Sequence, residues 1–246
     1  MQVQLLGSGG FAPSDRRETA SALVTKDGEA LLIDAGTGAR RLLTEPSLLD
    51  GVEHLHVVLT HFHLDHVVGL FFLAGIETPL TIWGAGETLE SLPTRSLVDR
   101  LLRPPFAPAS FQAAYEDVRE LDIAGETQLG PFALRARVQP LHSNPTLALR
   151  LDEALVWCTD TAHDEQNVEF AGGAHVLFHE AFSDAGSPTH TAAQKAAELA
   201  AAAGVERLVL IHLDPELQDE AALLECARAV FPAVELAVDG LVVTVP

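Results

Sequence analysis

Residues 60–66 read Thr-His-Phe-His-Leu-Asp-His, so three imidazoles and one carboxylate fall within a short stretch that follows an apolar run. Imidazole nitrogen and carboxylate oxygen suit divalent metals such as zinc, manganese and iron. In an extended segment His61 and His63 project to one side, because strand side chains alternate. Asp65 and His66 fall at the start of a helix predicted over Leu64 to Leu73. The stretch therefore predicts ligands for two adjacent metals, rather than a histidine-rich surface loop.

Ligand-type residues also follow the carboxyl ends of other apolar runs. Because the strands of α/β sheets collect such residues at one edge, these side chains are expected to share a site with the histidine stretch. The residues in question are His142 after 132–138, Asp160 after 155–157, Glu180 after 176–178, and His212 after 208–211. Each alone could be an ordinary core, loop or capping residue, and their order along the chain favours the site.

The spacing His-x-His-x-Asp-His in residues 61–66 resembles the signature of the metallo-β-lactamase-fold hydrolases. That resemblance implies an α/β fold, a four-layer αββα sandwich. It also implies one domain over 1–246 with two similar halves, about 1–125 and 126–246, and a possible homodimer. The metal ligands that it implies are His61, His63 and His142 for the first ion, Asp65, His66 and His212 for the second, and Asp160 bridging both.

A second set of residues resembles the ribonuclease Z-like phosphodiesterase branch of that family. Residues 177–182 and 189–194 are similar to its His-Glu-Ala-Thr and His-Ser-Thr elements. The resemblance implies that His190 acts on the phosphate or the leaving oxygen and that Glu180 orients it. Together with Asp65, these are the predicted catalytic residues. The pattern Thr191-x-x-Gln194 predicts a capping box that opens a helix ending at Gly204.

Other segments are predicted to support the site. Asp34, at the end of a strand-like run, is expected to buttress the metal loop by hydrogen bonding, with a turn or cap as the alternative. The glycine-rich residues 7–10 are expected to form a tight turn close to the site, since a phosphate loop would need a following Gly-Lys-Ser/Thr. Lys26-Asp27-Gly28 indicates a hairpin. Residues 104–108 form a proline-rich loop, which is either a lid or a plain surface connection.

The charge and cysteine composition limits which partners and which compartment we expect for the chain. Lys and Arg total 15 against 35 Asp and Glu, which gives a net charge of -20. A field of that sign repels polyanions, so nucleic acid is not expected as a partner and a small anionic substrate is. Cys158 and Cys226 are expected to be buried and reduced. No leader and no apolar run long enough for a bilayer are visible, so a cytoplasmic protein without a membrane partner is expected.

The function expected is that of a dinuclear metal-dependent hydrolase, with zinc favoured over manganese or iron. Two such metals share a bridging water and deprotonate it at neutral pH. The favoured substrate is a small phosphodiester or a cyclic nucleotide. One alternative is a hydrolase of a lactone, thioester or sulfate ester, and another is a ribonuclease Z-type tRNA 3′ endonuclease. A protein that binds metal without catalysis is a further alternative.

Overall fold

Two β-sheets of seven strands each form the centre of the computed structural model, which describes residues 1–111, 115, 117–183 and 185–246. In spatial order the first sheet contains β14 (Val242–Thr244), β1 (Gln2–Gly7), β2 (Ser21–Lys26), β3 (Glu29–Ile33), β4 (Leu55–Val58), β5 (Leu80–Gly84) and β6 (Val118–Glu120). The second contains β13 (Val234–Leu236), β12 (Arg207–Ile211), β11 (Val176–Glu180), β10 (Leu155–Cys158), β9 (Thr146–Leu151), β8 (Phe132–Gln139) and β7 (Glu126–Leu129).

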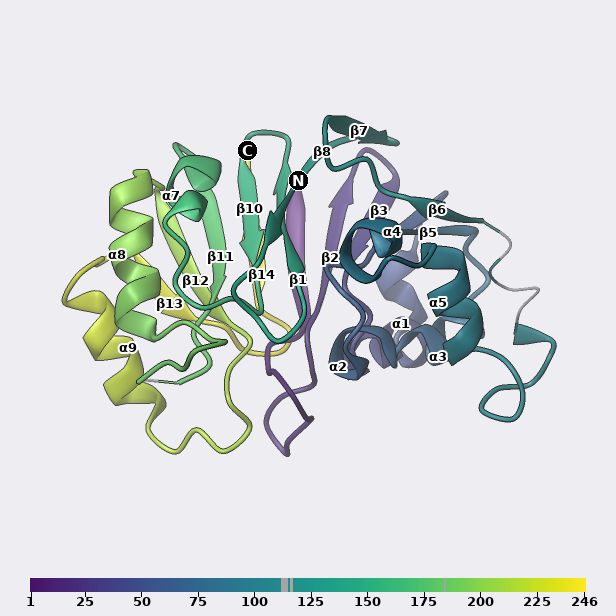
Figure 1. Ribbon diagram of the computed structural model, residues 1–246, viewed down its shortest axis with the longest axis horizontal. Coiled ribbons are helices and arrows are strands. Elements are labelled where there is room, and N and C mark those ends of the chain that lie inside the picture. Colours follow the sequence, from purple (N-terminus) through teal and green to yellow (C-terminus); the bar gives the residue numbers. More distant parts are fainter. Residues whose placement is uncertain (112–114, 116, 184) are drawn as a thin grey trace.

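The sheets pack face to face, and helices cover both outer faces (Figure 1). Beside the first sheet lie η1 (Thr37–Arg40), α1 (Arg41–Thr44), η2 (Pro46–Leu49), α2 (Leu64–Val67), α3 (Leu70–Leu73), α4 (Gly86–Glu90) and α5 (Thr94–Leu101). Beside the second lie α7 (Gln166–Ala171), α8 (Ala193–Ala203) and α9 (Glu220–Arg228). This arrangement confirms the predicted four-layer α/β sandwich.

Three apolar clusters correspond to the three interfaces between the layers. The cluster between the sheets includes Trp157 and Phe178, whose rings are 5.3 Å apart between centroids. A second cluster lies under α8, which places six buried residues, mostly alanines, against the sheet. A third lies between the first sheet and its helices. Burial of apolar surface on both faces explains why the central strands are near-continuous apolar runs.

Strand direction brings the site together. Strands β3 to β6 are parallel to one another, and so are β10 to β13. Strand β8 is antiparallel to β9, which is antiparallel to β10, so β8 and β10 run the same way. The carboxyl ends of β8, β10, β11 and β12 therefore meet at one edge of the second sheet, as the sequence predicts.

Three local expectations need correction. The helix predicted over Leu64 to Leu73 is two short helices, because the Gly69 N–H donates to the Ala35 carbonyl oxygen at 2.7 Å and the Asp65 carbonyl oxygen accepts from Thr19 Oγ1 instead of from within the helix. Cys226 is exposed rather than buried, whereas Cys158 is buried. No side chain caps α8, so the predicted capping box is wrong, although Gly204 ends the helix with φ 65°.

The hairpin prediction is confirmed. Strands β2 and β3 pair antiparallel with Lys26 opposite Glu29, and the two turn residues Asp27 and Gly28 both have positive φ. Among the described residues, no helix combines the length and the apolarity that crossing a bilayer requires.

Candidate metal centre

All seven predicted metal ligands lie around one cavity of about 520 Å³ or directly beneath it. His61, His63, His142 and Asp160 offer donor atoms that lie within 4.8 Å of one another, and Asp65, His66 and His212 form a second such group. The first group joins the loop after β4 to the loops after β8 and β10, and the second joins α2 to the end of β12.

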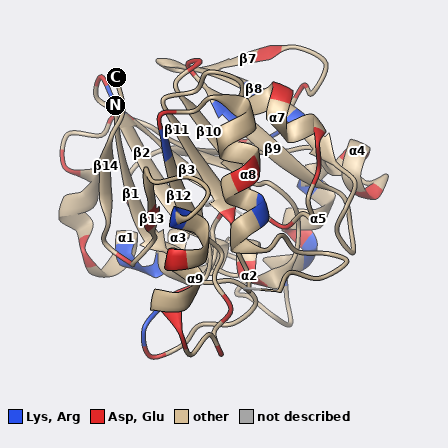
Figure 2. Ribbon diagram, turned by 90° about the vertical axis from the view of Figure 1, so that its left-hand side faces the viewer, with Lys and Arg blue, Asp and Glu red and all other residues tan. Residues whose placement is uncertain are grey.

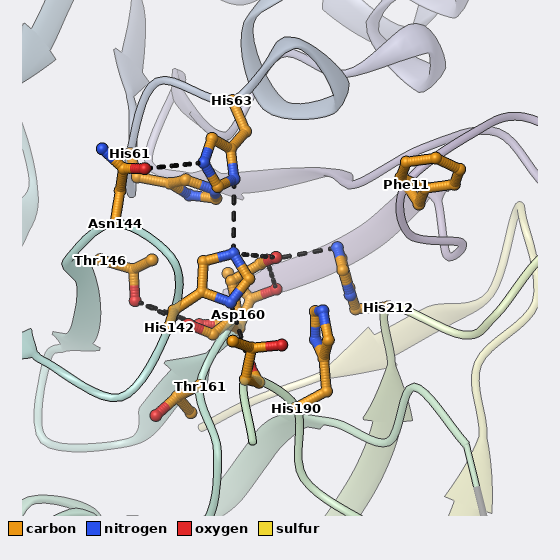
Figure 3. A network of polar contacts seen from close by, with 12 residues as sticks. Phe11, His61, His63, His142, Asn144, Thr146, Asp160, Thr161, His190 and His212 are labelled. Carbon is orange, nitrogen blue, oxygen red and sulfur yellow. Dashed lines mark hydrogen bonds and ion pairs between the residues drawn. The ribbon is translucent and has the colours of Figure 1, made fainter. Parts of the chain in front are cut away.

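Asp160 lies between the two groups. Its Oδ2 is 3.0 Å from His66 Nε2 and 3.2 Å from His212 Nε2, and its Oδ1 is 3.6 Å from His142 Nε2. Figure 3 shows the resulting chain of contacts from Asn144 through His63, His142 and Asp160 to His212. One carboxylate thus presents an oxygen to each group, which is the geometry that a bridging ligand needs.

Hydrogen bonds fix which ring nitrogen each histidine presents. Nδ1 of His61 lies 3.1 Å from Thr60 Oγ1, and Nδ1 of His142 lies 3.0 Å from the Thr189 carbonyl oxygen. Donation from these Nδ1–H groups leaves each Nε2 as a lone pair that faces the cavity. His63 presents the other nitrogen to the metal groups: its Nε2 faces Asn144 and its Nδ1 faces His142. Outer partners of this kind orient metal-binding imidazoles.

The donor set fits divalent metal ions. The Nε2 atom of His61 is buried and has no hydrogen-bond partner among the described residues, although it points into a group of other donors. A buried polar atom without a partner is costly, and a bound cation would satisfy it. Nitrogen and oxygen donors in this number suit zinc, manganese or iron.

Asp34 supports the centre as predicted. This fully buried carboxylate accepts hydrogen bonds from the Thr60 backbone N–H at 2.7 Å, from the Thr60 hydroxyl, and from His66 Nδ1 at 2.8 Å. It therefore fixes both the start of the histidine loop and the tautomer of one ligand.

Strained backbone recurs at the strand ends that form the site. Asp34, Asp160 and His212 have φ values of 57°, 50° and 53°. Side chains rarely adopt this left-handed conformation, which costs about 1–3 kcal/mol each and collects at functional sites. Here Asp160 and His212 line the cavity, and Asp34 lies behind it against Thr60 and His66.

The glycine-rich turn closes one side of the centre. A Cβ on Gly10 would lie 2.4 Å from the His212 ring, so only glycine lets the turn approach that ligand. The next residue, Phe11, donates its backbone N–H to Asp65 Oδ2 at 2.8 Å. The expectation of a tight turn close to the site agrees with these contacts.

Asp160 and Asp65 are both biased toward the charged form, because nearby histidines outweigh burial and lower the pKa of each carboxyl. Burial opposes ionisation of Asp160, but His212 and His66 outweigh it and hold the pKa of this carboxyl well below its usual range. Burial likewise opposes the charge on His66, yet Asp160 and Asp34 raise the pKa of this imidazole well above its usual value. The site thus concentrates negative charge where a cation would bind.

The predicted pair of Glu180 and His190 borders the same centre. His190 Nδ1 lies 2.9 Å from Glu180 Oε2, and donor atoms of Asp160, His190 and His212 fall within 4.8 Å of one another. Glu180 is fully buried, and its other oxygen accepts the Thr161 backbone N–H. Phe182 stacks on the His190 ring at 4.5 Å between centroids. The imidazole is therefore held by the hydrogen bond to Glu180 and by ring contacts with Phe182, His142 and His212.

Comparison with known proteins agrees with this geometry. The family model of the beta-lactamase superfamily domain matches residues 29–213. The chain belongs to the metallo-β-lactamase superfamily. Over 301 aligned positions it is 28% identical to ribonuclease Z of Methanothermobacter thermautotrophicus, an alignment that covers 100% of this chain and 97% of the relative. It thus resembles the ribonuclease Z-like branch.

Two solved structures share the fold. The metallo-beta-lactamase fold protein YhfI from Bacillus subtilis aligns with a TM-score of 0.79 at 21% identity and covers 99% of both chains. The short form of human tRNase Z aligns with a TM-score of 0.71 at 22% identity and covers 100% of both chains.

The expectation that excludes nucleic acid as a partner is wrong, since this metallo-β-lactamase-fold chain matches a ribonuclease along its whole length. That expectation came from the net charge of -20. Net charge sets the long-range field, whereas bound cations can reverse the field at the site itself. The sign of the net charge therefore does not exclude a polyanionic partner.

Two residues of the centre were missed in the sequence. Asn144 Oδ1 lies 3.4 Å from His63 Nε2, and Asn144 Nδ2 donates to Glu90 Oε1 at 3.1 Å. Glu90 ends α4, far from the ligands in sequence, and no pattern links it to them. Asn144 lies two residues after His142, which is the one sequence signal that could have identified it.

Proposed function

We propose that this chain is a metal-dependent phosphodiesterase that cleaves RNA, with tRNA 3′-end processing as its reaction. The observation that carries the proposal is the His190–Glu180 pair, because an imidazole that borders the metal groups can protonate the leaving oxygen of a phosphodiester. The ribonuclease Z relative supports the RNA substrate.

In this proposal His61, His63 and His142 would hold one ion, Asp65, His66 and His212 would hold the other, and Asp160 would serve as a ligand to both. Zinc is the favoured metal, because imidazole and carboxylate are its usual ligands outside cysteine sites. When bound, such ions lower the pKa of water and neutralise charge on a phosphoryl group. Asp65 also positions the glycine turn through Phe11, so it orders the wall of the cavity as well.

His190 supplies the proton in this reaction. Hydrolysis forms a P–O bond to water oxygen and breaks the bond to the leaving ribose oxygen, which must take up a proton. His190 Nδ1 faces Glu180, so Nε2 is the nitrogen left for the substrate. Burial lowers the pKa of His190, but Asp160 and Asp65 oppose this effect, and burial raises the pKa of Glu180. The hydrogen bond to Glu180 orients the imidazole, and the charges of Asp160 and Asp65 favour the protonated form that a general acid needs.

The decisive experiment compares RNA with a small diester. Metal-loaded protein is incubated with a precursor tRNA that carries a 3′ trailer and, separately, with bis-p-nitrophenyl phosphate. Cleavage at the trailer junction is expected. His190→Ala should lower kcat by about 10²–10⁴, the usual contribution of a general acid. His175→Ala is the control, because this histidine pairs with Glu206 at the opposite end of β11.

Three results would count against the proposal. Rapid hydrolysis of the small diester without cleavage of any RNA would show that the substrate is not RNA. Turnover of a lactone or sulfate ester without diesterase activity would change the reaction class. A His190→Ala variant as active as wild type would remove the assigned proton donor.

A further inference from the structure

A second cavity, of about 460 Å³, adjoins the metal cavity. Leu64, which stands between two of the predicted ligands, lines both. The other lining residues are Leu59, Phe62, Val67, Leu70, Leu97, Val98, Arg100, Leu101 and Phe106. This cavity, here called the side pocket, is therefore almost wholly apolar and opens beside the catalytic centre.

The ligand stretch itself forms one wall of the side pocket. His61 and His63 face the metal groups, so Phe62 between them faces the opposite way and contributes to the pocket. Helix α2 leaves the Leu64 side chain 66% exposed, and Phe106 on the proline-rich loop is 78% exposed. Large apolar side chains at such exposure beside a cavity mark a binding surface.

The opposite wall carries positive charge. Arg100 lines the side pocket, and Arg103 lies on the exposed segment that leads to Phe106. Figure 2 shows basic positions on the ribbon near α5 and acidic positions spread over the fold. In a chain with only 15 Lys and Arg residues against 35 acidic ones, this pairing of guanidinium groups with an apolar wall is distinctive.

We infer that the side pocket receives a nucleobase of the RNA substrate next to the scissile phosphate, with Arg100 and Arg103 facing the adjoining phosphates. This inference rests on the proposed function. Aromatic platforms combined with guanidinium groups are the usual means of holding single-stranded nucleic acid. A phosphate at the metal centre places its neighbouring nucleoside at the boundary that Leu64 forms. An acyl chain would also fit the apolar wall, but it carries no phosphates that Arg100 and Arg103 could bind.

The test removes one base at a time. A series of precursor tRNAs carries a single abasic residue at successive positions around the cleavage site, and kcat/KM is measured on metal-loaded enzyme. One position should show a loss of about tenfold, the usual size of one stacking contact. Phe106→Ala should lower kcat/KM for the intact RNA by a similar factor, relative to bis-p-nitrophenyl phosphate. For that variant, removal of the base should cause no further loss.

Matched controls isolate the pocket. Phe71→Ala removes another exposed phenylalanine, which lies outside both cavities, and should leave the abasic profile unchanged. Arg100→Gln should reduce the slope of log KM against log salt by about 0.7, the value for one contact with single-stranded nucleic acid. Arg228→Gln on α9 should not change this slope.

The outcomes separate the two proposals. If the RNA is cleaved but neither base removal nor Phe106→Ala changes kcat/KM, the side pocket does not hold a base and the proposed function stands. If no RNA is cleaved and only the small diester turns over, the proposed function fails and this inference fails with it. If Phe106→Ala instead impairs hydrolysis of a long-chain ester, the pocket binds an acyl chain.

Discussion

Asp34→Asn should weaken metal binding although Asp34 is not a ligand. In the structure one carboxylate oxygen accepts the Thr60 N–H and the other accepts from His66 Nδ1. An asparagine can place its carbonyl oxygen against Thr60, but its NH₂ group then faces the His66 Nδ1–H. The two donors repel, so His66 is driven to the tautomer that carries its proton on Nε2, the nitrogen that faces the second group of donors.

The expected loss is about 10- to 100-fold in metal affinity, the usual effect of removing an outer partner of a ligating histidine. It corresponds to about 1.4–2.7 kcal/mol of binding free energy. The assay is competition for zinc against a chromophoric chelator, with metal content measured after dialysis. The weaker of the two sites should be the one that contains His66.

Asp239→Asn is the matched control for this prediction. Asp239 also accepts backbone N–H groups from two distant residues, Ser8 and Glu18, but contacts no imidazole. Both variants should lower the Tm of the metal-free protein, and only Asp34→Asn should shift the zinc Kd. Wild-type affinity at both sites of Asp34→Asn would refute the reasoning that Asp34 fixes the tautomer.

Three further predictions concern the turn, the core and one buried histidine. Gly10→Ala should displace the His212 ring, which a Cβ would meet at 2.4 Å, and should weaken binding of one metal more than the other; equal affinities would contradict this. Phe178→Ala removes a fully buried ring packed on Trp157 and should lower the urea-derived free energy of unfolding by about 3–5 kcal/mol, whereas a loss below 1 kcal/mol would show that the core refills. Burial lowers the pKa of His179 to about 4 in the folded protein. As the pH falls below about 6.5, this histidine is therefore protonated in the unfolded chain but still neutral in the folded one. Between pH 6.5 and 4 the free energy of unfolding of the wild type should therefore fall by up to about 3 kcal/mol more than that of His179→Leu. Parallel curves of stability against pH for the two proteins would exclude the effect.

Much of the architecture is readable from local sequence. Apolar runs that are buried on both faces become the parallel strands of a layered α/β fold, and ligand-type residues at their carboxyl ends must share an edge. The hairpin at Asp27 and Gly28 follows from turn chemistry alone. Helix boundaries were less predictable: Gly69 looks like a tolerated position within a helix, and only the structure shows that its N–H donates outside the helix, to the Ala35 carbonyl oxygen at 2.7 Å.

The capping prediction at Thr191 shows the same limit. Thr191 has the residue type of a cap, but its hydroxyl donates to the Thr161 carbonyl oxygen at 2.7 Å and so joins the His190 loop to the loop after β10. Which of two hydrogen bonds a hydroxyl makes depends on what the fold brings within reach. Here the Thr191 hydroxyl bonds the distant Thr161 carbonyl oxygen instead of a backbone N–H of its own helix.

The sequence by itself determined which ligand types are present, namely imidazoles and carboxylates at fixed spacing, and which strands carry them at their ends. Only the tertiary structure decided which nitrogen of each histidine faces the cavity, that Asn144 and Glu90 support His63, and that Phe62, Leu64 and Phe106 border a pocket beside the centre. The physical reason is that residue type and period are local properties, whereas hydrogen-bond partners and cavities depend on segments that meet only after the two sheets pack.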